Sequence, residues 1–249
     1  MTFTTPRIRY RNPPVVEVVC EIHFAGSSWD STLPGQFYDA IRERFPQKRE
    51  VRLMQARFTL GPEGESSADL LPGQPRVQFL NEAGDRWLQL GQDVIVVNKL
   101  RPYSRFEQWE GDLQLAIEIY RRLARPERIA LVSIRHLNRI DLPATVVPLQ
   151  DYFRIYPQLP ESFEPHGPFL VRFQVDRGGE HQTVVTFASA PSEHAETSCF
   201  VLDLLDICSH VRFENLDEQL RLGHRHLWQA FEESCTPTLK ETFGPEVEP

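Results

Sequence analysis

Each half of the chain carries several short runs of β-branched and aromatic residues and ends in one amphipathic segment with helical periodicity. The clearest of these segments has apolar residues every three or four positions: Phe106, Trp109, Leu113, Ile117, Tyr120 and Leu123. This spacing follows the 3.6-residue repeat of an α-helix. Ser104 and Glu107 form a capping box at its start, and Pro126 stops it. The pattern predicts a long helix over 104–125 that packs on a core.

The pattern of apolar runs, Pro and Gly predicts the order strand, helix, four strands, helix in residues 1–126. The predicted elements before the long helix are a strand over 15–24, a helix over 37–45, and strands over 51–60, 76–80, 86–90 and 93–99. Residues 61–75 are rich in Gly and Pro, so we expect an exposed loop there. This segment is the best candidate for mobility in the first half.

Residues 127–249 repeat this order with one strand fewer. The predicted elements are a strand over 128–142, a short helix over 149–156, strands over 168–176, 182–189 and 197–207, and a helix over 216–234. Gly178-Gly179 supplies a tight turn, since both residues can adopt positive φ.

The two halves together predict an α+β fold. A curved antiparallel sheet with one buried face would pack on long helices, in two similar halves of order β-α-β(3-4)-α that form one unit. This order of elements resembles TATA-binding-protein-like and helix-grip folds, and such an analogy carries no function.

The chain contains none of four common catalytic or cofactor-binding motifs, namely G-x-S-x-G, the P-loop, G-x-G-x-x-G and H-E-x-x-H. The sequence therefore disfavours an enzyme and predicts no cofactor. The four cysteines are scattered without a CxxC pair, so we expect reduced, buried thiols. His224 and His226 stand two apart on a predicted helix, on nearly opposite sides, and cannot share a metal. The sequence predicts no metal site.

The formal charge of −8 is carried by the second half. Residues 1–125 hold 17 Lys and Arg against 16 Asp and Glu, whereas residues 126–249 hold 10 against 19. This distribution makes nucleic acid an improbable partner and suits a basic protein surface or a homodimer, although an acidic face can also simply aid solubility. The chain has no long apolar run for a membrane span and no signal peptide at its start, so a cytoplasmic location is expected.

The candidate binding residues lie on or beside two predicted strands. In the segment 131–143, strand alternation places His136 and Asn138 on a mostly apolar face, where they are either buried groups with hydrogen-bond partners or the lining of a pocket. Arg135 and Arg139 share the opposite face with Asp141, where they can bind an anion or pair with acidic neighbours. A second small basic and aromatic group follows the strand over 93–99: Lys99, Arg101 and Tyr103.

Several segments resemble a sporadically distributed family of bacterial proteins of similar length and uncharacterised function. The most specific motifs are Pro13-Pro14-x-x-Glu17, Pro102-Tyr103 and Asn138-Arg139-Ile140. His136 departs from the family, which tends to have an aromatic residue there. The resemblance implies a patchily inherited protein linked to mobile elements or defence, and it implies no catalytic residues.

The leading hypothesis is a non-enzymatic protein-binding or regulatory module. The alternatives are a small-ligand or nucleotide sensor with a groove between sheet and helix, and an unrecognised hydrolase.

Overall fold

The computed structural model describes residues 8–60, 66–102, 107–163 and 167–247. Its main sheet is made of β2 (Val15–Ala25), β3 (Gln47–Leu60), β4 (Ser66–Leu80), β5 (Arg86–Gly91), β6 (Val94–Leu100), β7 (Arg128–Leu142), β8 (Leu170–Gly178), β9 (His181–Ala190) and β10 (Ser198–Ser209). These nine strands pair antiparallel in the order β3-β4-β5-β6-β2-β7-β10-β9-β8. The structure confirms the predicted α+β class with a large antiparallel sheet.

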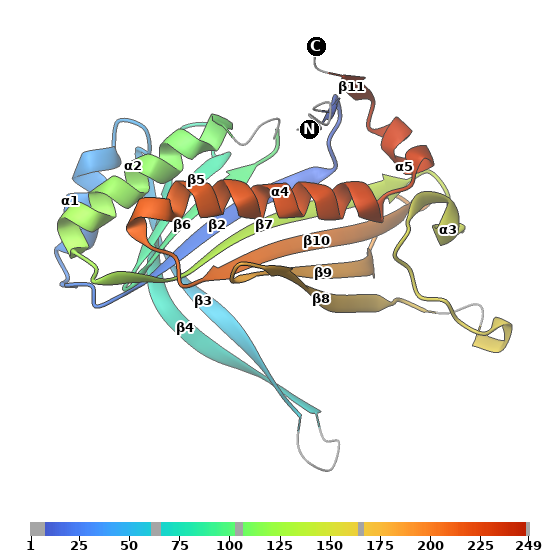
Figure 1. Ribbon diagram of the computed structural model, residues 1–249, viewed down its shortest axis with the longest axis horizontal. Helices are drawn as coiled ribbons and strands as arrows, with labels where there is room; N and C mark the ends of the chain where they lie inside the picture. The colour runs from blue at the N-terminus through green and yellow to red at the C-terminus, as the bar shows by residue number, and fades with distance from the viewer. Residues whose placement is uncertain (1–7, 61–65, 103–106, 164–166, 248–249) are drawn as a thin grey trace.

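The helices gather on one face of this sheet (Figure 1). They are α1 (Leu33–Ile41), α2 (Glu107–Ala124), α3 (Leu149–Tyr152), α4 (Leu216–Ser234) and α5 (Pro237–Thr242). The predicted helices over 104–125 and 216–234 correspond to α2, with 18 residues, and α4, with 19. The capping box cannot be assessed, because Ser104 lies outside the described residues.

The middle of the sheet joins the two halves of the chain. β2 and β7 pair antiparallel along most of their length, with bulges near Val15 and near His23. Strands β3 to β6 lie on the β2 side and strands β8 to β10 on the β7 side. One continuous sheet therefore runs through both halves.

Alternation along the strands sets which side chains meet the helices. In β2, Val18, Cys20, Ile22 and Phe24 are all buried, and Phe24 stacks on Tyr120 of α2 with 4.5 Å between ring centroids. Such a row of apolar side chains at every second position is what one buried sheet face requires. The expectation of a single buried face is too simple, because residues 94–99 of β6 are buried on both faces.

The loop predicted over 61–75 is wrong for most of its length. β3 and β4 form a long hairpin that projects away from the helices (Figure 1), and residues 66–75 belong to β4. Its outer part pairs only with β3, since β5 reaches no further than Val77 on β4. Prolines 72 and 75 are tolerated there because one side of the strand makes no ladder hydrogen bonds, and the register shifts beside them.

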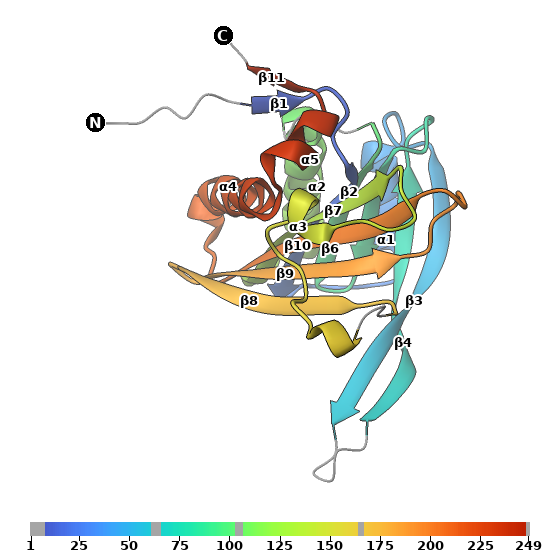
Figure 2. The same cartoon turned by 90° about the vertical axis from the view of Figure 1, so that its right-hand side faces the viewer.

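The two ends of the described chain pair with each other, which the sequence did not predict. β1 (Ile8–Tyr10) and β11 (Pro245–Val247) form a separate two-stranded sheet above α5 (Figure 2). Tyr10 is buried against Phe231 and Phe243 and donates a hydrogen bond to Glu232, 2.6 Å from its hydroxyl oxygen. The predicted helix over 149–156 is also shorter than expected, because only α3 is helical there.

Candidate functional site

The residues predicted to bind a ligand do not converge on one pocket. Arg101 and Arg139 come together at the ends of β6 and β7, where they line an open hollow of about 690 Å³. Arg139 is already paired there with Asp141 (3.1 Å) and Glu193 (3.3 Å). The hydrogen bond with Asp141 raises the pKa of Arg139, so its charge is balanced by its neighbours.

Lys99 and Tyr103 do not extend this basic group. Lys99 is buried and forms an ion pair with Asp85, which turns it away from the expected basic surface. Tyr103 lies outside the described residues. The predicted cluster of three is thus reduced to the exposed Arg101.

Arg135 lies on the face of the sheet opposite the helices. Its guanidinium donates two hydrogen bonds to the carboxylate of Asp203 on β10, at 2.7 and 2.6 Å. This hydrogen bonding, aided by the negative charges of Glu17 and Glu21, raises the pKa of Arg135. Ion pairing, rather than an open anion site, accounts for the predicted pair of arginines.

His136 and Asn138 face the helices and are buried, as their alternation predicts. The amide nitrogen of Asn138 donates to the carbonyl of Leu202 on the neighbouring strand, at 3.0 Å. The His136 ring lies 5.2 Å from that of His224 on α4, and burial lowers the pKa of His136 well below 6.5. Both residues are buried, and neither lines the hollow beside Arg101 or the one described next.

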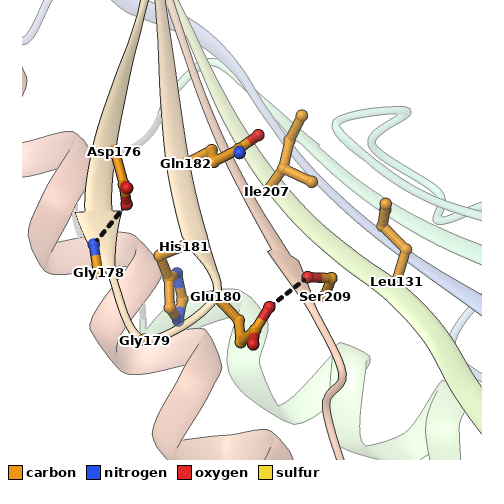
Figure 3. A pocket seen from close by; sticks show the side chains of 9 residues that line it. All are labelled: Leu131, Asp176, Gly178, Gly179, Glu180, His181, Gln182, Ile207 and Ser209. Atoms are coloured by element: carbon orange, nitrogen blue, oxygen red, sulfur yellow. Dashed lines mark hydrogen bonds between the residues drawn. The ribbon is translucent and has the colours of Figure 1, made fainter.

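A second hollow, of about 440 Å³, lies where the β8–β9 hairpin meets the end of β10 (Figure 3). Two carboxylates border it, Asp176 and Glu180, and its lining contains neither Lys nor Arg. Glu180 accepts hydrogen bonds from Ser209 and from His210, and the bond from His210 lowers the pKa of Glu180. We call this feature the acidic hollow.

Strand β8 is the edge of the sheet beside the acidic hollow. It pairs with β9 on one side, and most of its side chains are exposed. Leu170 and Phe173 are 66% and 39% exposed. An edge strand with exposed apolar side chains is a ready template for pairing with another chain. We call residues 170–178 the exposed edge.

Three polar side chains meet in the core beneath α4. His181 on β9 and His226 on α4 point their Nδ1 atoms at Asp206 on β10, at 2.6 and 3.1 Å from its carboxylate oxygens. Thr183 donates a hydrogen bond to Asp206 at 3.0 Å. His181 and Asp206 are buried, and the side chain of His226 is 13% exposed. Burial lowers the pKa of His226, although its bond with Asp206 opposes that shift. We call these three residues the histidine–aspartate cluster.

Sequence reasoning missed this cluster. His224 and His226 do contact different groups, as their spacing predicts, but His226 finds its partners on β9 and β10. The register of the sheet places His181 opposite Cys208, two residues beyond Asp206, so these groups become neighbours only through strand pairing. Polar residues at alternate positions within apolar strands, such as Asp206 between Leu204 and Cys208, were the available signal.

All four cysteines are buried and free, as expected. None of the described helices is long and apolar enough to cross a membrane.

No family model and no curated protein matches the chain. The resemblance carried by its motifs therefore stays a prediction.

Proposed function

We propose that this chain is a non-enzymatic protein-binding module whose second half receives an extended, basic segment of a partner protein. The observation that carries the proposal is the adjacency of the acidic hollow and the exposed edge at one border of the sheet. The hollow would take a Lys or Arg side chain, and the edge would supply backbone hydrogen bonds and apolar contacts.

Charge supports a basic partner. The second half holds nearly twice as many acidic as basic residues, and part of this excess lies close to the hollow. Asp217 and Glu218 are exposed in the first turn of α4, and Glu214 is exposed just before it, in the segment that follows β10. Opposite charge accelerates encounter and selects partners, while apolar anchors such as Leu170 and Phe173 supply affinity.

Strand addition supports an extended partner. The outer side of β8 lies at the end of the strand order, so among the described residues no strand pairs with its backbone groups on that side. A peptide strand added there makes main-chain hydrogen bonds, and its alternate side chains would reach Leu170 on one face and Phe173 on the other. The partner should therefore alternate apolar and basic residues.

The test is selection of a random displayed peptide library on the full chain at low salt, followed by calorimetry of the enriched peptides. We expect peptides with alternating apolar residues and at least one Lys or Arg. Leu170→Lys with Phe173→Lys should weaken their binding at least tenfold, as should Glu180→Arg with Asp217→Arg. Val146→Lys, at an 84% exposed apolar residue after β7, and Glu233→Arg, at the far end of α4, are the matched controls.

Enriched peptides without basic residues, or binding that neither pair of substitutions weakens, would contradict the proposal. The partner itself can then be sought by purification from the native host at low and moderate salt. Self-association of the chain that the edge substitutions abolish would instead identify a second copy as the occupant.

A small-ligand or nucleotide sensor is the second candidate, and the open hollow lined by Arg101 and Arg139 is its candidate site in place of the expected groove between sheet and helix. A thermal-shift screen separates the two, because a ligand specific to the folded state raises stability by RT ln(1 + [L]/Kd). A specific shift that Arg101→Ala removes would favour the sensor.

The proposal also covers the division into halves, the fold analogy and the biological context of the protein. The strand orders on the two sides of the β2–β7 junction are consistent with halves divided near residue 126, and with the analogy to TATA-binding-protein-like and helix-grip folds. The family resemblance of the motifs supports a cytoplasmic bacterial protein linked to mobile elements or defence, whose basic partner would supply the chemistry that this chain lacks.

A further inference from the structure

The histidine–aspartate cluster has the ligand set of a transition-metal site. We propose that His181, Asp206 and His226 bind one divalent cation of the zinc type through two imidazole nitrogens and a carboxylate oxygen. Their ligand atoms all lie within 4.8 Å of one another. Small side-chain rotations bring such atoms to the metal–ligand distances of about 2.0–2.2 Å that Zn²⁺ requires.

The hydrogen bonds of His181 are the first argument for a cation in this place. Its Nε2 lies 2.8 Å from the amide oxygen of Gln219, and its Nδ1 lies 2.6 Å from a carboxylate oxygen of Asp206. The carboxylate of Asp206 only accepts hydrogen bonds, whereas the Gln219 amide can accept or donate, so the tautomer of His181 is free to leave Nδ1 as a ligand atom. A metal ion between Nδ1 and Asp206 would use both groups as ligands.

The surroundings are those of a supported metal site. A ligating histidine commonly donates its other N–H to a carbonyl, and His181 Nε2 lies within hydrogen-bond distance of the Gln219 amide oxygen. A ligating carboxylate is commonly hydrogen-bonded, as Asp206 is by Thr183. Gly223 lets α4 approach closely, since a Cβ at this position would lie 2.8 Å from Asp206 Oδ1. These contacts hold Asp206 between the two histidines, with one histidine on each carboxylate oxygen.

The buried negative charge of Asp206 favours a bound metal ion over a purely structural role for the cluster. Within the described ranges, Asp206 forms its ion pairs with histidines, and no Lys or Arg is paired with it. A divalent cation would compensate the buried carboxylate directly. Two imidazoles and one carboxylate suit Zn²⁺, Co²⁺ or Ni²⁺ better than Mg²⁺ or Ca²⁺, and three ligands leave a position for water on the side of the partly exposed His226.

The metal would hold together β9, β10 and α4, the three elements that carry its ligands. His181 also lines the acidic hollow, so metal binding would fix the β8–β9 hairpin beside it. The inference goes beyond the proposed partner binding and does not depend on it.

The test is calorimetric titration of tag-free, chelator-treated protein with ZnCl₂, with visible absorption of the Co²⁺ form to report tetrahedral nitrogen and oxygen ligation. We expect one ion per chain and a rise in Tm on addition of Zn²⁺. His226→Ala and Asp206→Asn should each lower the affinity at least a hundredfold. Thr183→Val, which removes the supporting hydrogen bond to Asp206 together with the acceptor of the Arg177 Nε–H, should lower it about tenfold. His210→Ala, at an exposed histidine paired with Glu180, should leave it unchanged.

The wild-type protein alone also decides the question, in case the variants do not fold. Long-range ¹H–¹⁵N spectra distinguish a metal-bound imidazole from a doubly protonated one. Zinc that shifts the His181 and His226 nitrogens at one equivalent supports the site. Imidazolium signals from His181 that Zn²⁺ leaves unchanged, or zinc binding that His226→Ala does not weaken, would show that the cluster holds a proton and overturn the proposal.

Discussion

The two halves of the molecule each bury one aspartate where a long helix meets the sheet, and they compensate its charge differently. Asp112 on α2 forms ion pairs with Arg44 and with Arg86, the latter at 2.9 Å, and its side chain is 1% exposed. Asp206 beneath α4 has two histidines instead. Arginine keeps its charge throughout the physiological pH range, whereas imidazole gains or loses a proton or binds a metal there. The first aspartate therefore faces guanidinium groups, and the second faces imidazole groups.

The side chains that the two helices place on the sheet around these aspartates also differ in polarity. α2 places Trp109 and Tyr120 on the sheet, and both are fully buried. α4 places His224 and His226 over β7 and β10, opposite the buried His136 and Asp206. Both helices bury apolar residues, and the second interface also buries polar and titratable groups.

The largest effect is expected from Trp109→Ala in the first interface. Removing a fully buried aromatic side chain should lower the free energy of unfolding by about 3–5 kcal/mol. Urea unfolding measures this, and Trp228→Ala on α4, at a tryptophan that is 37% exposed, should cost less. A loss below about 1 kcal/mol would show that Trp109 is not part of the core.

Asp112→Asn should have the next largest effect, about 2–3 kcal/mol, because hydrogen bonds to a charged group are worth about 1.5–3 kcal/mol each. The loss should be equal at pH 6 and pH 8, since Arg44 and Arg86 keep their charges. Asp39→Asn, at an exposed ion pair with Arg42, is the control and should cost almost nothing. A loss of stability that differs between pH 6 and pH 8 would contradict the proposed difference between the Asp112 and Asp206 sites.

Asn138→Leu tests the polar contacts of the second interface. The side chain is 4% exposed, and its removal leaves the Leu202 carbonyl without the amide donor. We expect a loss of about 1–3 kcal/mol in chemical unfolding. An unchanged stability would mean that the carbonyl is satisfied by other donors, and that this interface tolerates apolar packing as well as the first one does.

The smallest effect concerns pH and His136. Burial, together with His224 opposite it, lowers the pKa of His136 well below 6.5, so the unfolded chain binds a proton at a higher pH than the folded protein does. The contribution of neutral His136 to the free energy of unfolding is complete above pH 6.5. It is lost as the pH falls below that value, at up to about 1.4 kcal/mol per pH unit.

His136→Phe should flatten the loss of stability between pH 7 and pH 5, as measured by urea unfolding at each pH. If the stability of the variant falls as steeply with decreasing pH as that of the wild-type protein, groups other than His136 cause the acid sensitivity.

Some features followed from local pattern alone. The strand over 128–142 and the helix over 216–234 have the predicted bounds, because their apolar spacing and their flanking Pro and turn residues are local signals. The burial of His136 and Asn138 followed from alternation within one strand. The long hairpin was missed because its prolines imply a loop unless one knows that the strand has an unpaired side.

The sequence by itself determined the elements, the apolar faces and the acidic character of the second half, since each depends on neighbouring residues or on composition. Only the tertiary structure decided which polar groups meet. Asp206 reaches His181 through strand pairing and His226 through the packing of α4. Arg44, in the turn after α1, and Arg86 on β5 reach Asp112 in the same way. Such contacts join residues that are distant in the chain, and their partners are set by strand register and helix position, which no local pattern encodes.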